Sequence, residues 1–515
     1  MIKIPIFIIV HDQYDILKKS VESYETQIDY PIEIVFHNVA SKYFETLNYL
    51  KEKENEGYLV YHSSINRHVS VKRSIENYLS KHPECEYIII TDPDIQLYNI
   101  NKDIIQFYIH LLNTTNKVAV GPMLKIDDIP NYYPSKNFIV SMHGRGHWNQ
   151  PKKSIEFNGN KYEYINTHID TTFQLLRANK IPKKFPTTNS IRTLNPYAAR
   201  HLDWYINPNN IMPCQLFYFF NTTGLSHWNN RESKSNMFTR KFKKPYNYIY
   251  INKKCAKSKR GYNFGDHVTS YIFYRIYNQF AHIDINGGKE KKDVVFGAGS
   301  ILNKAKNNSI IWGTGFMFPT DKAIKPKKIL SVRGPLTRKR LLDIGLECPE
   351  CYGDIGLILP YFYYPSVNKK HKIGIIPHYI DIPTFNNIHT EDNEDIKIID
   401  VSKSVSEVIC DILSCEMTIS SSLHGIIVSH AYNIRCLWIK MSDLIAGGTF
   451  KFRDYYGSLN MENYEKMEPY IYDKQLSIDE LNKLINEYPN PEFPINTKHI
   501  LQKCPFINIG TEFNI

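Results

Sequence analysis

Two carboxylates stand one residue apart directly after an apolar run, where Tyr87–Thr91 leads into Asp92 and Asp94. The run predicts a short buried strand. Two carboxylates at the end of such a strand can hold a divalent cation through their oxygen atoms, and that cation can neutralise a diphosphate leaving group. The alternative is a pair of solvated turn residues without a ligand, because Asp-x-Asp triplets are common.

A second group of polar residues lies where a predicted strand enters a predicted helix, from Ser420 and Ser421 to His424. Serine hydroxyls and the unpaired backbone N–H groups of a helix N-terminus can bind an anion, so we expect these serines to contact substrate. A histidine beside an anion site can donate a proton. The alternative is a buried or capping histidine with a structural role.

Alternating strand and helix patterns position the acidic pair. Over the first 120 residues this alternation predicts a mainly parallel α/β sheet that binds ligands at the carboxyl ends of its strands. Residues 121–228 lose the alternation and are rich in His, Trp, Tyr, Pro and Asp, so we expect long active-site loops there. The expected strands are Ile4–Val10, Ile32–Phe36, Tyr58–Tyr61, Tyr87–Thr91 and Lys117–Val120.

A basic stretch, Arg231–Lys244, interrupts the alternation, which then restarts. We therefore expect a first domain at 1–230, a basic linker at 231–245, a second domain at 246–475 and a C-terminal extension at 476–515. The second domain is expected to have strands at Tyr248–Ile251, Asp293–Phe296, Ile310–Trp312, Ile329–Val332, Ile373–Pro377, Lys397–Val401, Met417–Ser421 and Cys436–Ile439. Its expected helices are Asp266–Gln279, Pro335–Ile344, Val405–Leu413 and His424–Tyr432.

Composition narrows the class of protein. The chain has 515 residues, 42% hydrophobic residues and a net charge of +11, which is typical of a multidomain globular protein with anionic substrates. No nucleic-acid-binding module accompanies the basic residues, so we expect no nucleic-acid partner.

The 9 irregularly spaced cysteines favour a cytoplasmic location. No apolar stretch of about 18 residues predicts a transmembrane segment, which leaves peripheral membrane contact as an option.

In its strand–helix context, the acidic turn resembles that of GT-A glycosyltransferases of the family 2 type, over roughly residues 1–228. Further segments carry the resemblance: Pro5–Asp12, Gly121–Pro130, Ile169–Phe173, His201–Tyr205 and Ser226–Trp228. The resemblance implies a single Rossmann-type domain that transfers a sugar from a nucleotide sugar to a glycan acceptor. It also implies inversion at the anomeric carbon and a bound Mn²⁺ or Mg²⁺.

The same resemblance implies roles for individual residues. Asp94 would bind the metal, and Asp92 would bind the metal or the ribose. Inverting transfer needs a carboxylate that takes the proton of the acceptor hydroxyl, and Asp203 stands where that base usually falls, with Asp170 as its rival. The remaining expectations are a third metal contact from His227 and a place for His11 at the nucleotide-binding edge.

Ordered short motifs surround His424: Tyr262–Asp266, Gly297–Ser300, Trp312–Gly315, Ser331–Pro335, Tyr352–Asp354, Gly374–His378 and Phe450–Asp454. This set resembles the polysaccharide pyruvyltransferase family across roughly residues 246–460. The resemblance implies a two-lobed, GT-B-like domain with its site between the lobes. It also implies that phosphoenolpyruvate donates a pyruvyl ketal to a sugar of a glycan.

Phosphoenolpyruvate carries a carboxylate and a phosphate, so its pocket needs fixed cations. Arg333 is the first candidate and Lys451 and Arg453 are the next. Ketal formation begins by protonation of the methylene carbon, for which His424 is the expected general acid.

Either Asp266 or Asp354 would position the acceptor or act as base. Many members of the family have Arg where this chain has Ser422, so Lys451 or Arg453 would supply that charge.

The leading interpretation is therefore a bifunctional enzyme of glycan assembly. In the alternatives, the second domain is another glycosyltransferase or a glycan-binding scaffold.

Overall fold

The computed structural model describes residues 2–64, 68–182, 185–222, 228, 246, 248–251, 263–284, 292–388 and 393–513. The chain is a mixed α/β protein, which confirms the expected class, and it divides into two compact units. The first unit comprises Met1–Lys241 with Glu512–Ile515, and the second comprises Phe242–Thr511. The predicted metal contact His227 and the basic stretch Arg231–Lys244 lie outside the described residues.

The first unit is built on a nine-stranded sheet with the order β3-β2-β1-β4-β9-β6-β10-β8-β7. β1 (Ile4–Val10) is buried along its whole length, as expected of a central parallel strand covered on both faces. It pairs in parallel with β2 (Ile32–Val39) and β4 (Tyr87–Thr91), and β3 (Leu59–Ser63) continues this half of the sheet. The helices between and after these strands are α1 (Tyr14–Gln27), α2 (Phe44–Asn55), α3 (His68–Lys81) and α4 (Ile104–Thr114).

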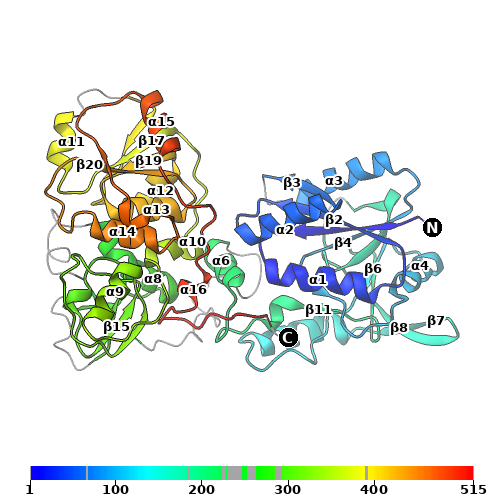
Figure 1. Ribbon diagram of the computed structural model, residues 1–515. Coiled ribbons are helices and arrows are strands. Elements are labelled where there is room, and N and C mark those ends of the chain that lie inside the picture. The colour runs from blue at the N-terminus through cyan, green and yellow to red at the C-terminus, as the bar shows by residue number, and fades with distance from the viewer. Residues whose placement is uncertain are drawn as a thin grey trace. The chain divides into compact units, whose positions relative to one another are not determined.

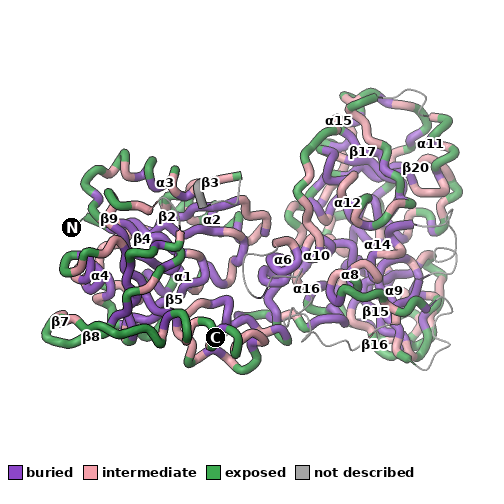
Figure 2. Tube along the Cα trace, turned by 180° about the vertical axis from the view of Figure 1, so that it is seen from behind, coloured by how far each residue is buried: buried purple, intermediate pink, exposed green. Residues whose placement is uncertain are grey.

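The other half of the sheet is mixed. β9 (Gln174–Arg177) runs antiparallel to β4 and to β6 (Ala119–Pro122), and β10 (Ser190–Thr193) runs parallel to β6. The sheet ends in an exposed hairpin of β7 (Lys152–Phe157) and β8 (Asn160–Asn166), which Figure 2 shows in green.

The prediction of long loops over 121–228 is therefore wrong in part. This segment adds strands to the sheet and forms α5 (Lys136–His143), the π-helical turn η1 (Gly144–Trp148) and α6 (Pro213–Asn221).

A small two-stranded sheet positions the acidic turn. β5 (Ile95–Gln96) follows Asp94 directly and pairs antiparallel with β11 (Arg200–His201). The 3-10 helix η3 (Leu202–Tyr205) follows β11 and carries Asp203. Two segments about 100 residues apart are thereby held against each other at the end of β4.

The second unit contains two five-stranded sheets, and every recorded strand pair within them is parallel. The first has the order β13 (His282–Asp284), β12 (Tyr248–Tyr250), β14 (Val294–Phe296), β15 (Ser309–Trp312) and β16 (Lys328–Ser331). The second has the order β18 (Ile396–Ile398), β17 (His371–Ile376), β19 (Cys415–Ser420), β20 (Cys436–Lys440) and β21 (Tyr470–Ile471).

Helices cover both sheets. Figure 1 shows α8 (Val268–Tyr277) and α9 (Pro335–Asp343) in the lobe of β15, and α11 (Ile382–Ile388) and α15 (Ile478–Glu487) in the lobe of β17. The remaining helices are α10 (Leu359–Phe362), α12 (Val405–Leu413), α13 (Leu423–Ala431), α14 (Phe450–Gly457) and α16 (Lys498–Leu501).

The segment expected as a C-terminal extension packs into the second unit. Leu481 of α15 is fully buried in the core beneath the second sheet. The Trp312 indole N–H donates to Ile500 O at 3.2 Å, and the Tyr277 hydroxyl donates to Phe506 O. Residues after 476 therefore complete the cores of both sheets of this unit.

Candidate functional site

Three side chains that could bind a metal ion lie close together at the end of β4 in the first unit. One ligand atom each of Asp94, His201 and Asp203 lies within 4.8 Å of the others. Asp94 Oδ2 is 3.6 Å from His201 Nδ1, and Leu202 N donates to Asp94 O at 2.7 Å. The structure thus brings together Asp94 and Asp203, which were both predicted as site residues. It adds His201, for which no role was predicted.

The electrostatics of this cluster fit a bound cation. Burial, together with the charge of Asp170, raises the pKa of Asp94 to about 7, although a hydrogen bond with Asp203 acts in the opposite direction. Burial and the nearby Asp94 raise the pKa of Asp92 well above its usual value. Asp94 Oδ1 and His201 Nδ1 have no hydrogen-bond partner among the described residues. Because carboxylate oxygens are suitable ligands for Mn²⁺, the two aspartates of the cluster could hold the expected metal.

Asp92 and Asp170 lie near this cluster, and His11 lies at the end of β1. The Thr171 hydroxyl donates to Asp92 Oδ2, and Asp92 N donates to Thr171 O at 2.7 Å. Asp170 is exposed and accepts from Thr171 N at 3.0 Å. His11 follows β1, and its Nδ1 is 2.7 Å from Val39 O at the end of β2.

Asp12 also lies at the end of β1, and no role was predicted for it individually. It is buried, and its Oδ1 accepts from Lys42 N and Tyr43 N, each at 2.7 Å. Tyr218 of α6 links it to the cluster: burial raises the pKa of this phenol well above its usual value, and Asp203, Asp94, Asp12 and Asp92 raise it further. The sequence signal for Asp12 was its position as a polar residue shortly after the first strand.

In the second unit, the imidazole of His424 is held between a glycine and an aspartate. His424 Nε2 is 3.8 Å from Asp354 Oδ2, and neither atom has a hydrogen bond among the described residues. Asp354 Oδ1 is fixed by Gly356 N at 2.8 Å. On the other side, a Cβ on Gly265 would lie only 2.0 Å from His424 Nδ1, so the ring packs against bare backbone.

A nearly buried amine belongs to the same site. Lys451 lies in the first turn of α14 and is 7% exposed, and no hydrogen bond to it is recorded within the described residues. Burial and then the charge of Arg333 lower its pKa to about 8, while Asp266 and Asp381 raise it. The amine therefore lies within electrostatic reach of an arginine and two carboxylates.

His378 and Asp381 were not predicted as site residues. Burial, followed by the charges of Lys451 and His424, lowers the pKa of His378 to about 3, so this imidazole is neutral at pH 7. Asp381 is fully buried, and its Oδ1 accepts from the Ser442 hydroxyl. Both follow β17, the strand beside β19, which leads to His424.

The guanidinium of Arg333 is fully buried and held on three sides. It donates from Nε to Asp454 Oδ2 at 2.9 Å, from Nη1 to Ser300 Oγ at 2.6 Å and from Nη2 to Phe316 O at 2.6 Å. Arg453 lies two residues from Lys451, but its guanidinium donates to Met467 O and to Glu468. The structure does not bring Arg453 to the group around His424.

The serines before His424 join neighbouring strands. The Ser420 hydroxyl is 2.9 Å from Ile376 O, and the Ser421 hydroxyl accepts from His378 N at 2.9 Å. Ser422 is the N-cap of α13, and its side chain makes no capping bond. The first two hydroxyls therefore hold the ends of β17 and β19 together beneath the site.

Comparisons with known proteins match part of the chain, and the family match begins within the first unit and ends within the second. Residues 216–443 match the family model of polysaccharide pyruvyl transferase. Uncharacterized protein L143 of Acanthamoeba polyphaga mimivirus is 27% identical over 213 residues, which are 40% of this chain and 72% of that protein. Succinoglycan biosynthesis protein ExoV of Rhizobium meliloti is 24% identical over 212 residues, 39% of this chain and 62% of ExoV. The chain thus spans less than two thirds of ExoV.

Solved structures give weaker similarities. The mannosyltransferase PcManGT from Pyrobaculum calidifontis, in complex with GDP-Man and Mn²⁺, is 16% identical with a TM-score of 0.20 over 24% of this chain and 36% of its own. S. aureus TarS in complex with UDP-GlcNAc is 13% identical with a TM-score of 0.25 over 47% of this chain and 76% of its own. These TM-scores are too low to assign a common fold.

No helix among the described residues has both the length and the apolar composition needed to cross a bilayer. The match of residues 216–443 to the polysaccharide pyruvyl transferase family covers less than half of the chain.

Proposed function

We propose that this chain is a bifunctional enzyme of glycan assembly whose second unit transfers a pyruvyl ketal from phosphoenolpyruvate to a glycan sugar. The observation that carries this proposal is the nearly buried Lys451 amine, which lies, like the His424–Asp354 pair, within electrostatic reach of His378. A cation without a hydrogen-bonded partner suits an anionic substrate, and an imidazole beside a carboxylate suits proton transfer. The family match of residues 216–443 supports the same reaction.

In the proposed reaction, His424, Lys451 and one aspartate each act on a different group of the substrates. His424 donates a proton to the methylene carbon of phosphoenolpyruvate, which becomes a methyl group, and the adjacent carbon is attacked by one sugar hydroxyl. A second hydroxyl of the sugar displaces phosphate from that carbon and closes the ketal. Of the two hydroxyl protons, one replaces the proton given by His424 and the other leaves with phosphate. Lys451 binds the phosphate or the carboxylate, and Asp266 or Asp354 takes the hydroxyl proton.

The direct test is phosphate release from phosphoenolpyruvate in the presence of exopolysaccharide oligosaccharides. We expect His424→Gln to lower this rate by about 100-fold or more, in the range found for general acid catalysis. His282→Gln is a matched control, because His282 is exposed on β13 of the same unit. Unchanged phosphate release in His424→Gln would show that the acid is wrongly assigned.

We further propose that the first unit transfers a sugar from a nucleotide sugar in a GT-A-like arrangement. The cluster of Asp94, His201 and Asp203 favours this function, because these residues could hold Mn²⁺ or Mg²⁺. A bound cation would neutralise the diphosphate of the leaving nucleotide. Asp203 is the proposed base. If it binds the cation instead, the exposed Asp170 takes that role.

Two variants separate these roles. Asp203→Asn and Asp170→Asn are compared for Mn²⁺ affinity and for nucleotide release from a panel of UDP-, GDP- and dTDP-sugars. A base variant loses turnover and keeps Mn²⁺ affinity, whereas a ligand variant loses both. Asp29→Asn is the control, since Asp29 is exposed before β2.

The alternatives predict different results. A second glycosyltransferase in the GT-B-like second unit would bind a nucleotide sugar there and release no phosphate from phosphoenolpyruvate. A glycan-binding scaffold would turn over neither class of donor.

A further inference from the structure

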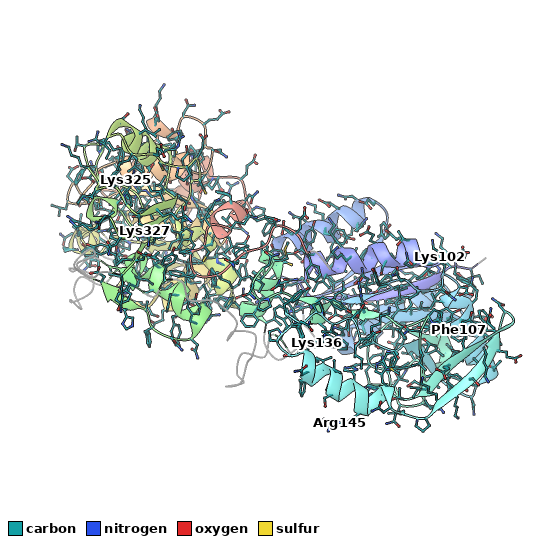
Figure 3. All side chains as sticks on the ribbon, turned by 90° about the horizontal axis from the view of Figure 1, so that it is seen from below. Lys102, Phe107, Lys136, Arg145, Lys325 and Lys327 are labelled. Atoms are coloured by element: carbon teal, nitrogen blue, oxygen red, sulfur yellow. The ribbon has the colours of Figure 1, made fainter. Side chains whose placement is uncertain are left out.

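A group of basic and imidazole side chains adjoins the carboxylates of the first unit. It consists of Arg192 on β10, His147 in η1 and His168 in the loop after β8. The rings of His147 and His168 have centroids 4.7 Å apart, and His147 Nδ1 is 3.0 Å from Thr167 Oγ1. Arg145 of the same turn is exposed and points away from the unit, so it does not belong to the group (Figure 3).

Arg192 is a buried cation without a carboxylate at ion-pair distance in the described part of the chain. Its side chain is 3% exposed, and it donates from Nε to His168 O at 2.9 Å and from Nη1 to Pro122 O at 2.8 Å. Three of the five N–H bonds of its guanidinium, including both at Nη2, therefore have no acceptor among the described residues. Nη2 is not among the fully buried unpaired atoms of the described residues, so this edge of the guanidinium is open to an anion that would satisfy its N–H groups.

The charges around Arg192 set the charge of that anion. Burial lowers the pKa of Arg192 to about 10, against the attraction of Asp170, so the guanidinium stays charged at pH 7. Burial and the neighbouring Arg192 and His168 lower the pKa of His147 to about 4, which keeps this imidazole neutral. A single fixed positive charge next to Asp170 suits a monoanion better than a dianion. A planar guanidinium edge matches two oxygens of a carboxylate or a phosphodiester.

The group lies within reach of the proposed reaction centre. The ring centroids of His147 and His143 are 5.3 Å apart, His143 lies 4.8 Å from Trp204, and Trp204 stacks on His201 at 4.8 Å. On the other side, Arg192 donates to His168 O, and Thr171, three residues further along the chain, donates from its hydroxyl to Asp92 Oδ2. A sugar bound at the cation-binding carboxylates could extend a charged substituent to Arg192.

We propose that Arg192, His147 and His168 form a subsite for a monoanionic group, a carboxylate or a phosphodiester, on the sugar substrate of the first unit. The proposal rests on the proposed glycosyl transfer by that unit. One source of the group is the pyruvate ketal, since it carries a carboxylate. In that case pyruvylation of the acceptor precedes sugar transfer. The other source is a phosphodiester of the glycan chain.

The test measures binding of four small ligands to the full chain in the presence of Mn²⁺, without turnover. The ligands are methyl galactoside, its 4,6-pyruvate ketal, methyl glucuronide and a galactosyl glycerol phosphodiester. We expect an anionic ligand to bind more tightly than methyl galactoside by on the order of 10- to 100-fold, the range for hydrogen bonds to a charged group. Tighter binding of the glucuronide and the ketal would indicate a carboxylate subsite. Tighter binding of the glycerol phosphodiester would indicate a phosphodiester subsite.

Two variants assign the preference to this subsite. Arg192→Gln should remove the preference and leave binding of methyl galactoside unchanged. His168→Gln should reduce it. If Arg192→Gln melts below the assay temperature, His168→Gln tests the anion preference instead, because His168 is exposed and its replacement leaves the core intact. His62→Gln, which changes an exposed histidine of β3 in the same unit, should leave the preference as in the wild type.

Equal affinity of the wild type for all four ligands would overturn the subsite, as would an anion preference that both variants retain. A preference that depends on Arg192, in a protein that transfers no sugar, would instead refute the proposed glycosyl transfer and leave the anion site in place.

Discussion

The contact between Gly265 and His424 gives the sharpest prediction for the second unit. In Gly265→Ala the new methyl carbon would lie 2.0 Å from His424 Nδ1 and 2.2 Å from its Cγ. Ordinary van der Waals contact begins at 3.4 Å, so the imidazole has to retreat by about 1.4 Å (3.4 minus 2.0). That movement changes the 3.8 Å separation of His424 Nε2 and Asp354 Oδ2.

The size of the effect follows from this displacement. A misplacement of about 1 Å in a catalytic group can cost on the order of 100-fold in rate, so we expect phosphate release from phosphoenolpyruvate to fall by about that factor. An added methyl group in a packed site costs about 1–3 kcal/mol of folding free energy, which is compatible with a folded second unit.

The assay compares phosphate release and thermal melting of Gly265→Ala with those of the wild type. Gly146→Ala serves as the control, because a Cβ at Gly146 meets no atom within 4 Å and the residue lies in the first unit. Nucleotide release by the first unit should be unchanged in Gly265→Ala. The reasoning is refuted if Gly265→Ala melts normally and releases phosphate at the wild-type rate while His424→Gln is inactive.

Three further predictions concern charge, metal and packing. Since burial lowers the pKa of Lys451 to about 8, its charge is present below that pH and lost above it. Binding of phosphoenolpyruvate, measured by calorimetry, should weaken as pH rises through about 8 in the wild type, and Lys451→Met should abolish this dependence. Mn²⁺ at 100 times its Kd should stabilise the first unit by about 2.7 kcal/mol, and a melting shift that survives in Asp94→Asn would remove Asp94 from the metal site. Leu481→Ala should lower the unfolding free energy of the second unit by about 2–5 kcal/mol in urea, and a smaller loss would mean that α15 is not part of its core.

Long apolar runs make much of the fold predictable. The bounds of β1, β4 and α12 agree with those predicted from periodicity, since each is strongly patterned. The strands β9 and β10 escape prediction, because each has four residues and is stabilised by strands far away in the sequence. Local periodicity does not carry that information.

The clearest sequence signals for the candidate sites are polar residues shortly after a strand. Asp94 and His424 follow β4 and β19 in this way, whereas His201 reaches Asp94 only through the pairing of β5 with β11. Arg453 shows the opposite error. It was expected, like Lys451, as a cation that binds phosphoenolpyruvate, yet residues two apart on a helix point to different faces, and its guanidinium lies against Glu468.

The bonds from Trp312 to Ile500 and from Tyr277 to Phe506 join residues 188 and 229 positions apart. Such separations delay folding during synthesis, because the strands around Trp312 leave the ribosome long before the residues that cover them. A nascent chain that has reached the second sheet still exposes this indole and the aromatic side chains beside it. Chaperone dependence and aggregation on truncation should therefore be concentrated in the second unit.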